Sequence, residues 1–117
     1  MPYFVYIISC QGGTLYTGTA ADWQKRLREH QSRSPKAAKY TKSHPMEALQ
    51  ALWEVADKSA ALRLESRIKR LAAEEKRRLV SRPASCDEIL EGAQPVPSEN
   101  WGDFSPESNP NTEPGRR

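Results

Sequence analysis

The chain has 117 residues, of which 37% are hydrophobic and 28% charged, with a formal net charge of +3 and a mean hydropathy of −0.80. This length suits one domain, and the longest apolar run, Phe4 to Ile8, is far shorter than the roughly 20 residues of a membrane-spanning helix, which excludes a membrane protein. Cys10 and Cys86 stand in no CxxC or paired-histidine pattern and Met1 opens no basic leader, so we expect a reduced, cytoplasmic protein without a disulfide framework or zinc site.

The first predicted element is a β-hairpin. Residues Tyr3–Cys10 are rich in aromatic and β-branched side chains, which favours a strand buried on both faces. Gln11-Gly12-Gly13 is typical of a turn, and Thr14–Gly18 is expected to return as the second strand.

The hairpin register decides which side chains share a face. If the two strands pair about Gly12, Tyr6 faces Gly18, and Tyr6 and Tyr16 lie on one face at a diagonal spacing. Two interpretations stay open: two tyrosines with solvated hydroxyl groups, or a shared pocket that a ligand approaches over Gly18.

The next element is a helix from Trp23 to about Ser32, for which Asp22 is the expected N-cap. Arg26 and His30 are four residues apart and therefore neighbours on one face, bordering the apolar stripe of this helix. Arg26 is either solvent-facing or functional, and His30 is either a packing residue or a catalytic one.

A basic connection follows, in which three lysines, Lys36, Lys39 and Lys42, surround Tyr40. Ammonium groups neutralise phosphates and an aromatic ring offers a stacking surface, so this segment is a candidate nucleic-acid contact. A solvated loop is the alternative.

Residues 48–55 favour a third strand, a helix capped by Asp57 or Ser59 follows, and a last helix is expected over residues 74–81. Glu65 lies at the edge of the apolar stripe of the longer helix. It is either the partner of Lys69 in an i,i+4 ion pair or a ligand for a hard cation such as Mg²⁺. Lys76-Arg77-Arg78 on the last helix is either a solvated face or a nucleic-acid contact. The element order β-β-α-β-α-α predicts an α/β fold with a small three-stranded mixed sheet flanked by helices.

Charge and composition change at Pro83. Residues 1–82 hold 16 of the 18 Lys and Arg residues but 8 of the 15 acidic residues, a balance of +8, as expected for a domain that meets a polyanion. Residues 83–117 hold 2 basic and 7 acidic residues and six of the nine prolines, so we expect a flexible acidic tail. Within it, a short helix is expected over residues 86–91, and no regular structure beyond Gln94.

Several of these residues, taken in order, resemble the motifs of the GIY-YIG nuclease family, and the resemblance covers residues 3–79. The motifs are Phe4-Val5-Tyr6, Tyr16-Thr17-Gly18, Arg26 with His30, Ala38-Lys39-Tyr40-Thr41-Lys42, and Glu65 followed by Ile68-Lys69.

The resemblance implies a compact α/β domain that cleaves phosphodiesters with one divalent metal, Mg²⁺ or Mn²⁺. Glu65 would hold the metal, and Arg26 would offset charge on the phosphoryl oxygens. Tyr6 or Tyr16 would deprotonate the attacking water, His30 would orient the phosphate or share in proton transfer, and Gly18 would leave room for the strand. Ionising a phenol of ordinary pKa at pH 7 costs roughly 4 kcal/mol, so activity should rise from neutral to mildly alkaline pH.

The implied substrate is DNA rather than RNA, contacted by Gly18, by Lys36, Lys39, Tyr40 and Lys42, and by Lys69. With no second domain to recognise a sequence, cleavage is expected to be structure-selective or nonspecific. The motifs depart from the family at Phe4, Val5 and Thr17, and the Asn that larger members carry after the glutamate is absent, since the first Asn after Glu65 is Asn100. The alternatives are therefore a catalytically weak or inactive nucleic-acid-binding module of the same fold and an interaction protein that acts through its acidic tail.

Overall fold

The computed structural model describes residues 1–32 and 44–105 of the chain. Its strands are β1 (Tyr3–Cys10), β2 (Thr14–Ala20), β3 (Met46–Val55) and β4 (Gln94–Pro95). Its α-helices are α1 (Trp23–Ser32), α3 (Lys58–Lys69) and α4 (Ala73–Ser81), and three 3₁₀ helices follow: η1 (Pro83–Glu88), η2 (Ser98–Asn100) and η3 (Gly102–Phe104). The α/β class and the order of the elements up to residue 81 are as predicted from the sequence.

The four strands form one sheet in the order β2-β1-β3-β4, and every neighbouring pair is antiparallel. The expected three-stranded mixed sheet is therefore wrong in strand number and in strand direction. β2 and β3 do run parallel to each other, but β1 lies between them. The central β1, whose middle is buried on both faces, pairs along both of its edges instead of leaving β3 to pair with β2.

The β1–β2 turn has two glycines with positive φ, Gly12 at 95° and Gly13 at 82°, a backbone region that side chains rarely adopt. The pairing beyond the turn is as predicted: Cys10 faces Thr14 and Tyr6 faces Gly18. Turn chemistry and strand pattern agree here, which fixes the face on which each tyrosine lies.

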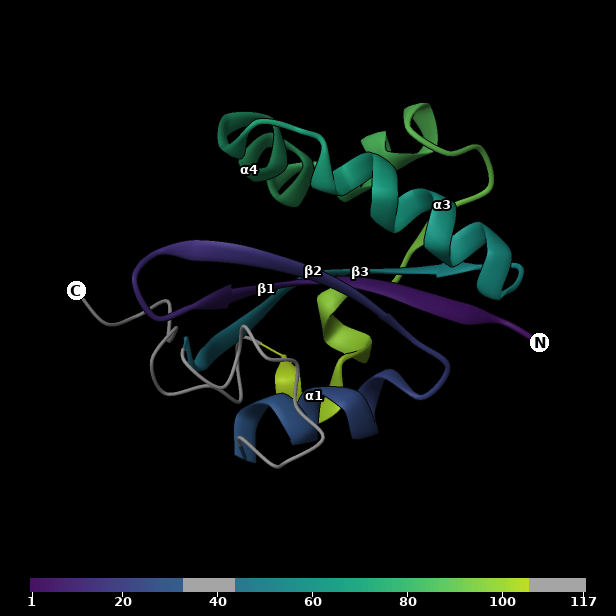
Figure 1. Cartoon of the computed structure of the whole chain (residues 1–117). Helices are drawn as coiled ribbons and strands as arrows, with labels where there is room; N and C mark the ends of the chain where they lie inside the picture. Colours follow the sequence, from purple (N-terminus) through teal and green to yellow (C-terminus); the bar gives the residue numbers. More distant parts are fainter. Residues whose placement is uncertain (33–43, 106–117) are drawn as a thin grey trace.

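Helices cover both faces of the sheet (Figure 1). On one face α3 and α4 pack over a core that includes Trp53 and Leu64, and on the other face α1 packs over a core that includes Tyr6 and Leu27. Two of these helices begin at the caps expected from the sequence. The Asp22 carboxylate accepts from the Lys25 amide at 3.1 Å, and Asp57 accepts from the Ala60 amide at 2.9 Å.

The segment after Arg82 belongs to both cores. Cys86 and Ala93 are buried on the α3 face, β4 then pairs with β3, and Trp101 and Phe104 are buried on the α1 face. The chain thus passes around the β3 edge from one face of the sheet to the other (Figure 1).

This path corrects two predictions. The expectation of no regular structure beyond Gln94 is wrong for residues 95–105, because β4, η2 and η3 lie there. The predicted short helix over 86–91 is a 3₁₀ helix over Pro83–Glu88 instead. Gly92, in the turn that follows this 3₁₀ helix, adopts a positive φ of 92°. Residues 106–117 of the expected tail lie outside the described residues.

Among the described residues, no helix combines the length and apolar character needed to cross a bilayer. The two cysteines are free thiols, Cys10 in the α1-face core and Cys86 in the α3-face core.

Candidate active site

The candidate site lies at the β2 edge of the sheet, where α1 approaches from one face and α3 from the other. Tyr6 comes from the central β1 and is 1% exposed, whereas Tyr16 comes from β2 and is partly exposed. Tyr16 pairs directly with Ile8, two residues after Tyr6, so the two tyrosines share the α1 face.

His30 joins the two tyrosines. It lies near the end of α1, is fully buried, and its Nε2 atom is 2.8 Å from the Tyr6 hydroxyl oxygen. Its ring centroid is 5.7 Å from that of Tyr6 and 5.7 Å from that of Tyr16, both in edge-to-face geometry. Burial, followed by the charge of Arg26, lowers the pKa of His30 to about 4, so the imidazole is neutral at pH 7.

Arg26 lies one turn before His30 on α1. Its Nη1 donates to the Glu29 Oε1 at 2.9 Å, and the guanidinium also donates to the Tyr6 oxygen. Because that oxygen already accepts from Arg26, we assign the Tyr6 proton to the bond with His30 Nε2. The result is a polar chain from Glu29 through Arg26 and Tyr6 to His30.

Tyr6 is a poor acid in this setting. Burial, together with the neighbouring Tyr16, raises the pKa of Tyr6 well above its ordinary value, although Arg26 acts in the opposite direction. The hydroxyl therefore stays protonated at neutral and mildly alkaline pH.

The α3 side of the site holds Glu65 and Lys69. Lys69 Nζ lies 3.1 Å from Glu65 Oε2 and 5.8 Å from the centroid of the Tyr16 ring. The predicted i,i+4 ion pair is therefore present, and it connects the carboxylate to Tyr16. The Glu65 side chain is 20% exposed, which leaves it partly open to solvent.

Gly18 is explained by Tyr6. A Cβ atom at Gly18 would lie 2.6 Å from Cζ of the Tyr6 ring, closer than real Cβ contacts. The space that the missing side chain leaves open is therefore filled by the phenol itself.

The structure brings together five residues singled out in the sequence: Tyr6, Tyr16, Arg26, His30 and Glu65. Gly18 and Lys69 lie beside them. Four other candidates, Lys36, Lys39, Tyr40 and Lys42, lie outside the described residues. Glu29 was missed, although an acid three residues after Arg26 on the same helix face is the pattern of an i,i+3 pair.

The donor set for a metal is small. Among the described residues, no group of three or more His, Cys, Asp or Glu side chains is placed to hold an ion. A zinc-type cage is therefore not built from this part of the chain. One partly exposed carboxylate at Glu65 fits instead the way Mg²⁺ is commonly held, by one or two carboxylates with water and substrate phosphate oxygens completing the shell.

Comparison with known proteins bears on these residues. The sequence model of the GIY-YIG catalytic domain matches residues 2–78, a range that contains all five. The UPF0213 protein FN1575 of Fusobacterium nucleatum is 36% identical over 96 residues, which cover 82% of this chain and 94% of the relative. The UPF0213 protein YhbQ of Escherichia coli is 38% identical over 93 residues, covering 80% of this chain and 91% of the relative. The solution NMR structure of the UPF0213 protein BH0048 from Bacillus halodurans is 35% identical, covers 77% of this chain and 97% of that one, and superposes with a TM-score of 0.45.

Proposed function

Because the chain belongs to the GIY-YIG family, we propose that it is an endonuclease that hydrolyses phosphodiester bonds of DNA with the help of Mg²⁺ or Mn²⁺. The observation that carries this proposal is the convergence of polar side chains from β1, β2, α1 and α3 on one edge of the sheet. These side chains supply a cation that can offset charge on a phosphate, a carboxylate that can hold a metal, and a partly exposed phenol that can take part in proton transfer.

Arg26 binds the phosphate. Its guanidinium is held by Glu29 and Tyr6 and stays partly exposed, so it faces solvent at the site in a fixed orientation. A guanidinium fixed in this way offsets the charge that builds on the phosphoryl oxygens in the transition state, without reorganising during the reaction.

Glu65 holds the divalent metal. A metal held there would polarise the scissile phosphate and stabilise the leaving oxygen. Lys69, paired with Glu65, lies near the ring of Tyr16 and places a positive charge beside the site, where it contacts the phosphate backbone.

Tyr16 accepts the proton of the attacking water. It is partly exposed and has a lysine ammonium group near its ring, whereas Tyr6 is buried and holds its own proton tightly. Tyr6 instead fixes His30 and receives the hydrogen bond from Arg26, so it orients the α1 side of the site.

The proposal extends to the substrate preference: cleavage of DNA is structure-selective or nonspecific. Lys36, Lys39, Tyr40 and Lys42 add contacts to the DNA backbone in this proposal. The protein acts in the cytoplasm.

The test is cleavage by the full-length chain of labelled single-stranded, duplex and branched DNA with Mg²⁺ or Mn²⁺. Glu65→Gln should abolish cleavage, because the neutral amide that replaces the carboxylate is a poor ligand for Mg²⁺. A chelator should abolish cleavage by removing the metal. The matched control is Glu74→Gln, an exposed acid on α4 that is likewise paired with a basic residue in the i,i+4 position.

Cleavage that survives in Glu65→Gln would contradict the assigned metal ligand. Binding to every substrate without cleavage would establish the alternative, a catalytically inactive nucleic-acid-binding module of the same fold.

A further inference from the structure

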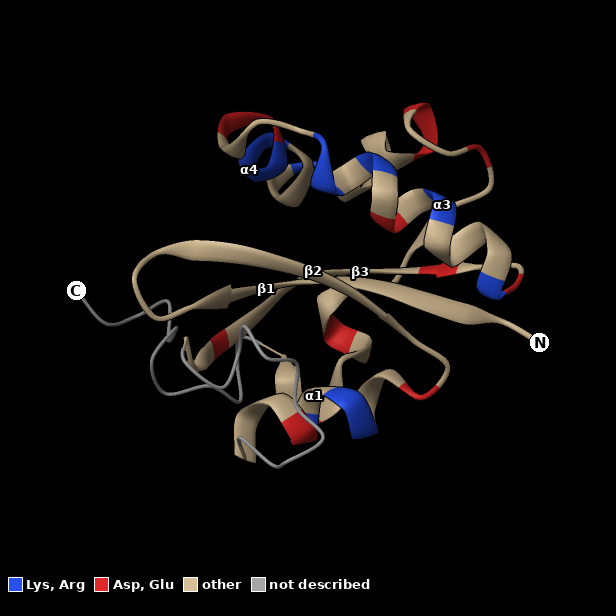
Figure 2. Cartoon of the chain, in the orientation of Figure 1, with Lys and Arg blue, Asp and Glu red and all other residues tan. Residues whose placement is uncertain are grey.

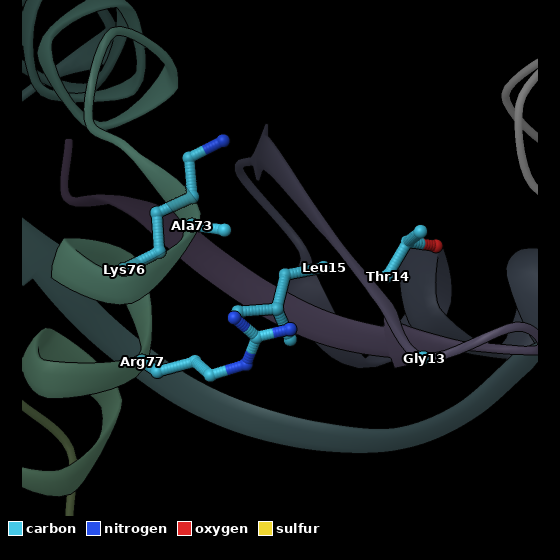
Figure 3. A pocket seen from close by; sticks show the side chains of 6 residues that line it. All are labelled: Gly13, Thr14, Leu15, Ala73, Lys76 and Arg77. Carbon is cyan, nitrogen blue, oxygen red and sulfur yellow. The ribbon is translucent and has the colours of Figure 1, made fainter.

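A second site lies outside the catalytic cluster, between the β1–β2 turn and α4. It is a pocket of about 220 Å³ lined by Gly13, Thr14, Leu15, Ala73, Lys76 and Arg77. Figure 3 shows the Arg77 side chain extending from α4 toward Leu15, while the Lys76 side chain leaves the same helix in a different direction, past Ala73. Two segments almost 60 residues apart in the sequence, one from the hairpin and one from α4, thus form its walls.

The two cations of this pocket have no acidic partner in the part of the chain that the structure describes. Other basic residues near the site differ: Arg26 pairs with Glu29, Lys69 with Glu65, and Arg78, the next residue along α4, with Glu74. Two adjacent unpaired cations beside one cavity repel each other, and a bound anion would relieve that repulsion. Figure 2 shows the surrounding strands to be largely free of charged residues.

The pocket continues the catalytic cluster along β2. Thr14 and Leu15 line it, and Tyr16, the next residue, belongs to the cluster. An antiparallel strand rises about 3.4 Å per residue, so Thr14 lies about 7 Å from Tyr16, roughly the distance between neighbouring phosphates along one DNA strand. Positive charge therefore lies along the β2 edge, on the side of α3 and α4. It comes from Lys69 near Tyr16 and from Lys76 and Arg77 at the pocket.

We propose that this pocket binds a phosphate of the nucleic-acid backbone that neighbours the scissile phosphate, with Lys76 and Arg77 as its ligands. This inference rests on the proposed function, because the catalytic cluster sets the position of the scissile bond. The volume supports a phosphate: it is several times the roughly 30 Å³ of a water molecule yet below the range of pockets for drug-sized ligands. The contact fixes the direction in which the strand leaves the active site.

The experiment measures the affinity of the full-length chain for a fluorescein-labelled DNA duplex by anisotropy, over a salt series and with EDTA present so that cleavage does not interfere. The variant Lys76→Ala/Arg77→Ala removes the two ligands. The control, Arg63→Ala/Arg78→Ala, removes the same charge from two exposed positions outside the pocket. A charge-reversal pair, Lys76→Glu/Arg77→Glu, provides a second variant, and thermal unfolding verifies that each protein is folded.

Loss of this one phosphate contact should reduce the magnitude of the slope of log K against log[salt] by about 0.9, the contribution of one neutralised phosphate. The control should leave the slope unchanged, and the charge-reversal pair should weaken binding further. Equal slopes for the pocket variants and the control would overturn the proposal.

Inorganic phosphate, titrated against the amide signals of Thr14 and Leu15, separates the two sources of a phosphate group. If phosphate shifts these signals while the DNA slopes stay equal, the pocket takes a free anion and the backbone assignment is wrong. Failure of the proposed function gives a different result: the wild-type chain would bind DNA with the pocket contributing, yet would not cleave it with any metal.

Discussion

The phenol ring of Tyr6 occupies the space that a side chain at Gly18 would need. The two residues face each other across β1 and β2, and a Cβ atom at Gly18 would approach the Tyr6 Cζ to 2.6 Å. The small residue of the second motif and the tyrosine of the first are therefore one structural unit, in which the absence of a side chain lets the phenol reach His30.

Gly18→Ala should therefore destabilise the protein by about 1–3 kcal/mol, the usual cost of overpacking a core, because Tyr6 has to move. The same substitution in a Tyr6→Ala background should be neutral or stabilising, since alanine is otherwise preferred to glycine within a strand by roughly 0.5–1 kcal/mol. Urea unfolding of the four proteins of this double-mutant cycle measures the coupling. If the two substitutions change the free energy of unfolding additively, there is no steric conflict between a side chain at position 18 and Tyr6.

His30 should make stability depend on pH. Its pKa is about 4 in the folded chain and near 6.5 when unfolded, so the unfolded chain binds the additional proton as the pH falls from 6.5 to 4. The free energy of unfolding should drop by about 3 kcal/mol across this window and no further below it. His30→Gln retains an acceptor for Tyr6 without titrating and should lack this contribution. Matching urea curves for the two proteins across the window would refute the buried neutral imidazole.

The two tyrosines should differ in their effect on the rate. Tyr16→Phe removes the proposed base and should slow cleavage by about 10² to 10⁴, the usual contribution of general base catalysis. It should also remove the rise in rate from neutral to mildly alkaline pH. Tyr6→Phe loses its hydrogen bonds but should keep that rise. A pH–rate profile in which only Tyr6→Phe is flat would transfer the role of base to Tyr6.

The segment after Arg82 should be necessary for folding. Trp101→Ala should cost about 3–5 kcal/mol, as expected for a buried tryptophan, whereas Glu99→Ala, an exposed neighbour on η2, should cost little. A chain that ends after Ser105 keeps every described core residue and should unfold with the cooperativity of the full chain. A chain that ends after Arg82 loses Cys86, Trp101 and Phe104 from the two cores, and we expect it not to unfold cooperatively. A folded, stable 1–82 fragment would contradict this expectation and support the division at Pro83.

Local pattern was sufficient to predict most of the fold up to residue 81. The hairpin register followed from its glycine turn, and Asp22 and Asp57 marked the starts of α1 and α3. The strand order and the antiparallel pairing of β3 with β1 could not be predicted, because nothing in a strand's own sequence decides which edge of β1 it joins.

The end of the chain could not be predicted by the same means. β4 has two residues, one of them Pro95, which is too short for any periodicity. Trp101 and Phe104 are isolated apolar residues in an acidic, proline-rich segment. They are buried only because they pack against a core formed by residues that are distant in the sequence. Phe104 also packs against Trp23 in a tilted ring geometry, with ring centroids 5.9 Å apart, which is a contact between distant parts of the chain.

The candidate site was predictable as a set of residues but not as a network. Spacing put Arg26 beside His30 and Glu65 beside Lys69. It did not show that the first pair meets Tyr6 from one face while Lys69 reaches Tyr16 from the other. Those contacts depend on how α1 and α3 pack against the sheet, which is a property of the complete fold.

The burial of Trp101 and Phe104 against α1 also orders events during synthesis. Because the ribosome makes the chain from its N-terminus, Tyr6 and Leu27 emerge long before the two aromatic residues that complete their core. The α3 face obtains its last core residue, Ala93, earlier. A nascent chain that already contains all five candidate catalytic residues therefore still lacks the support behind α1, and the catalytic edge of the sheet is completed by residues translated well after Glu65, the last of the five.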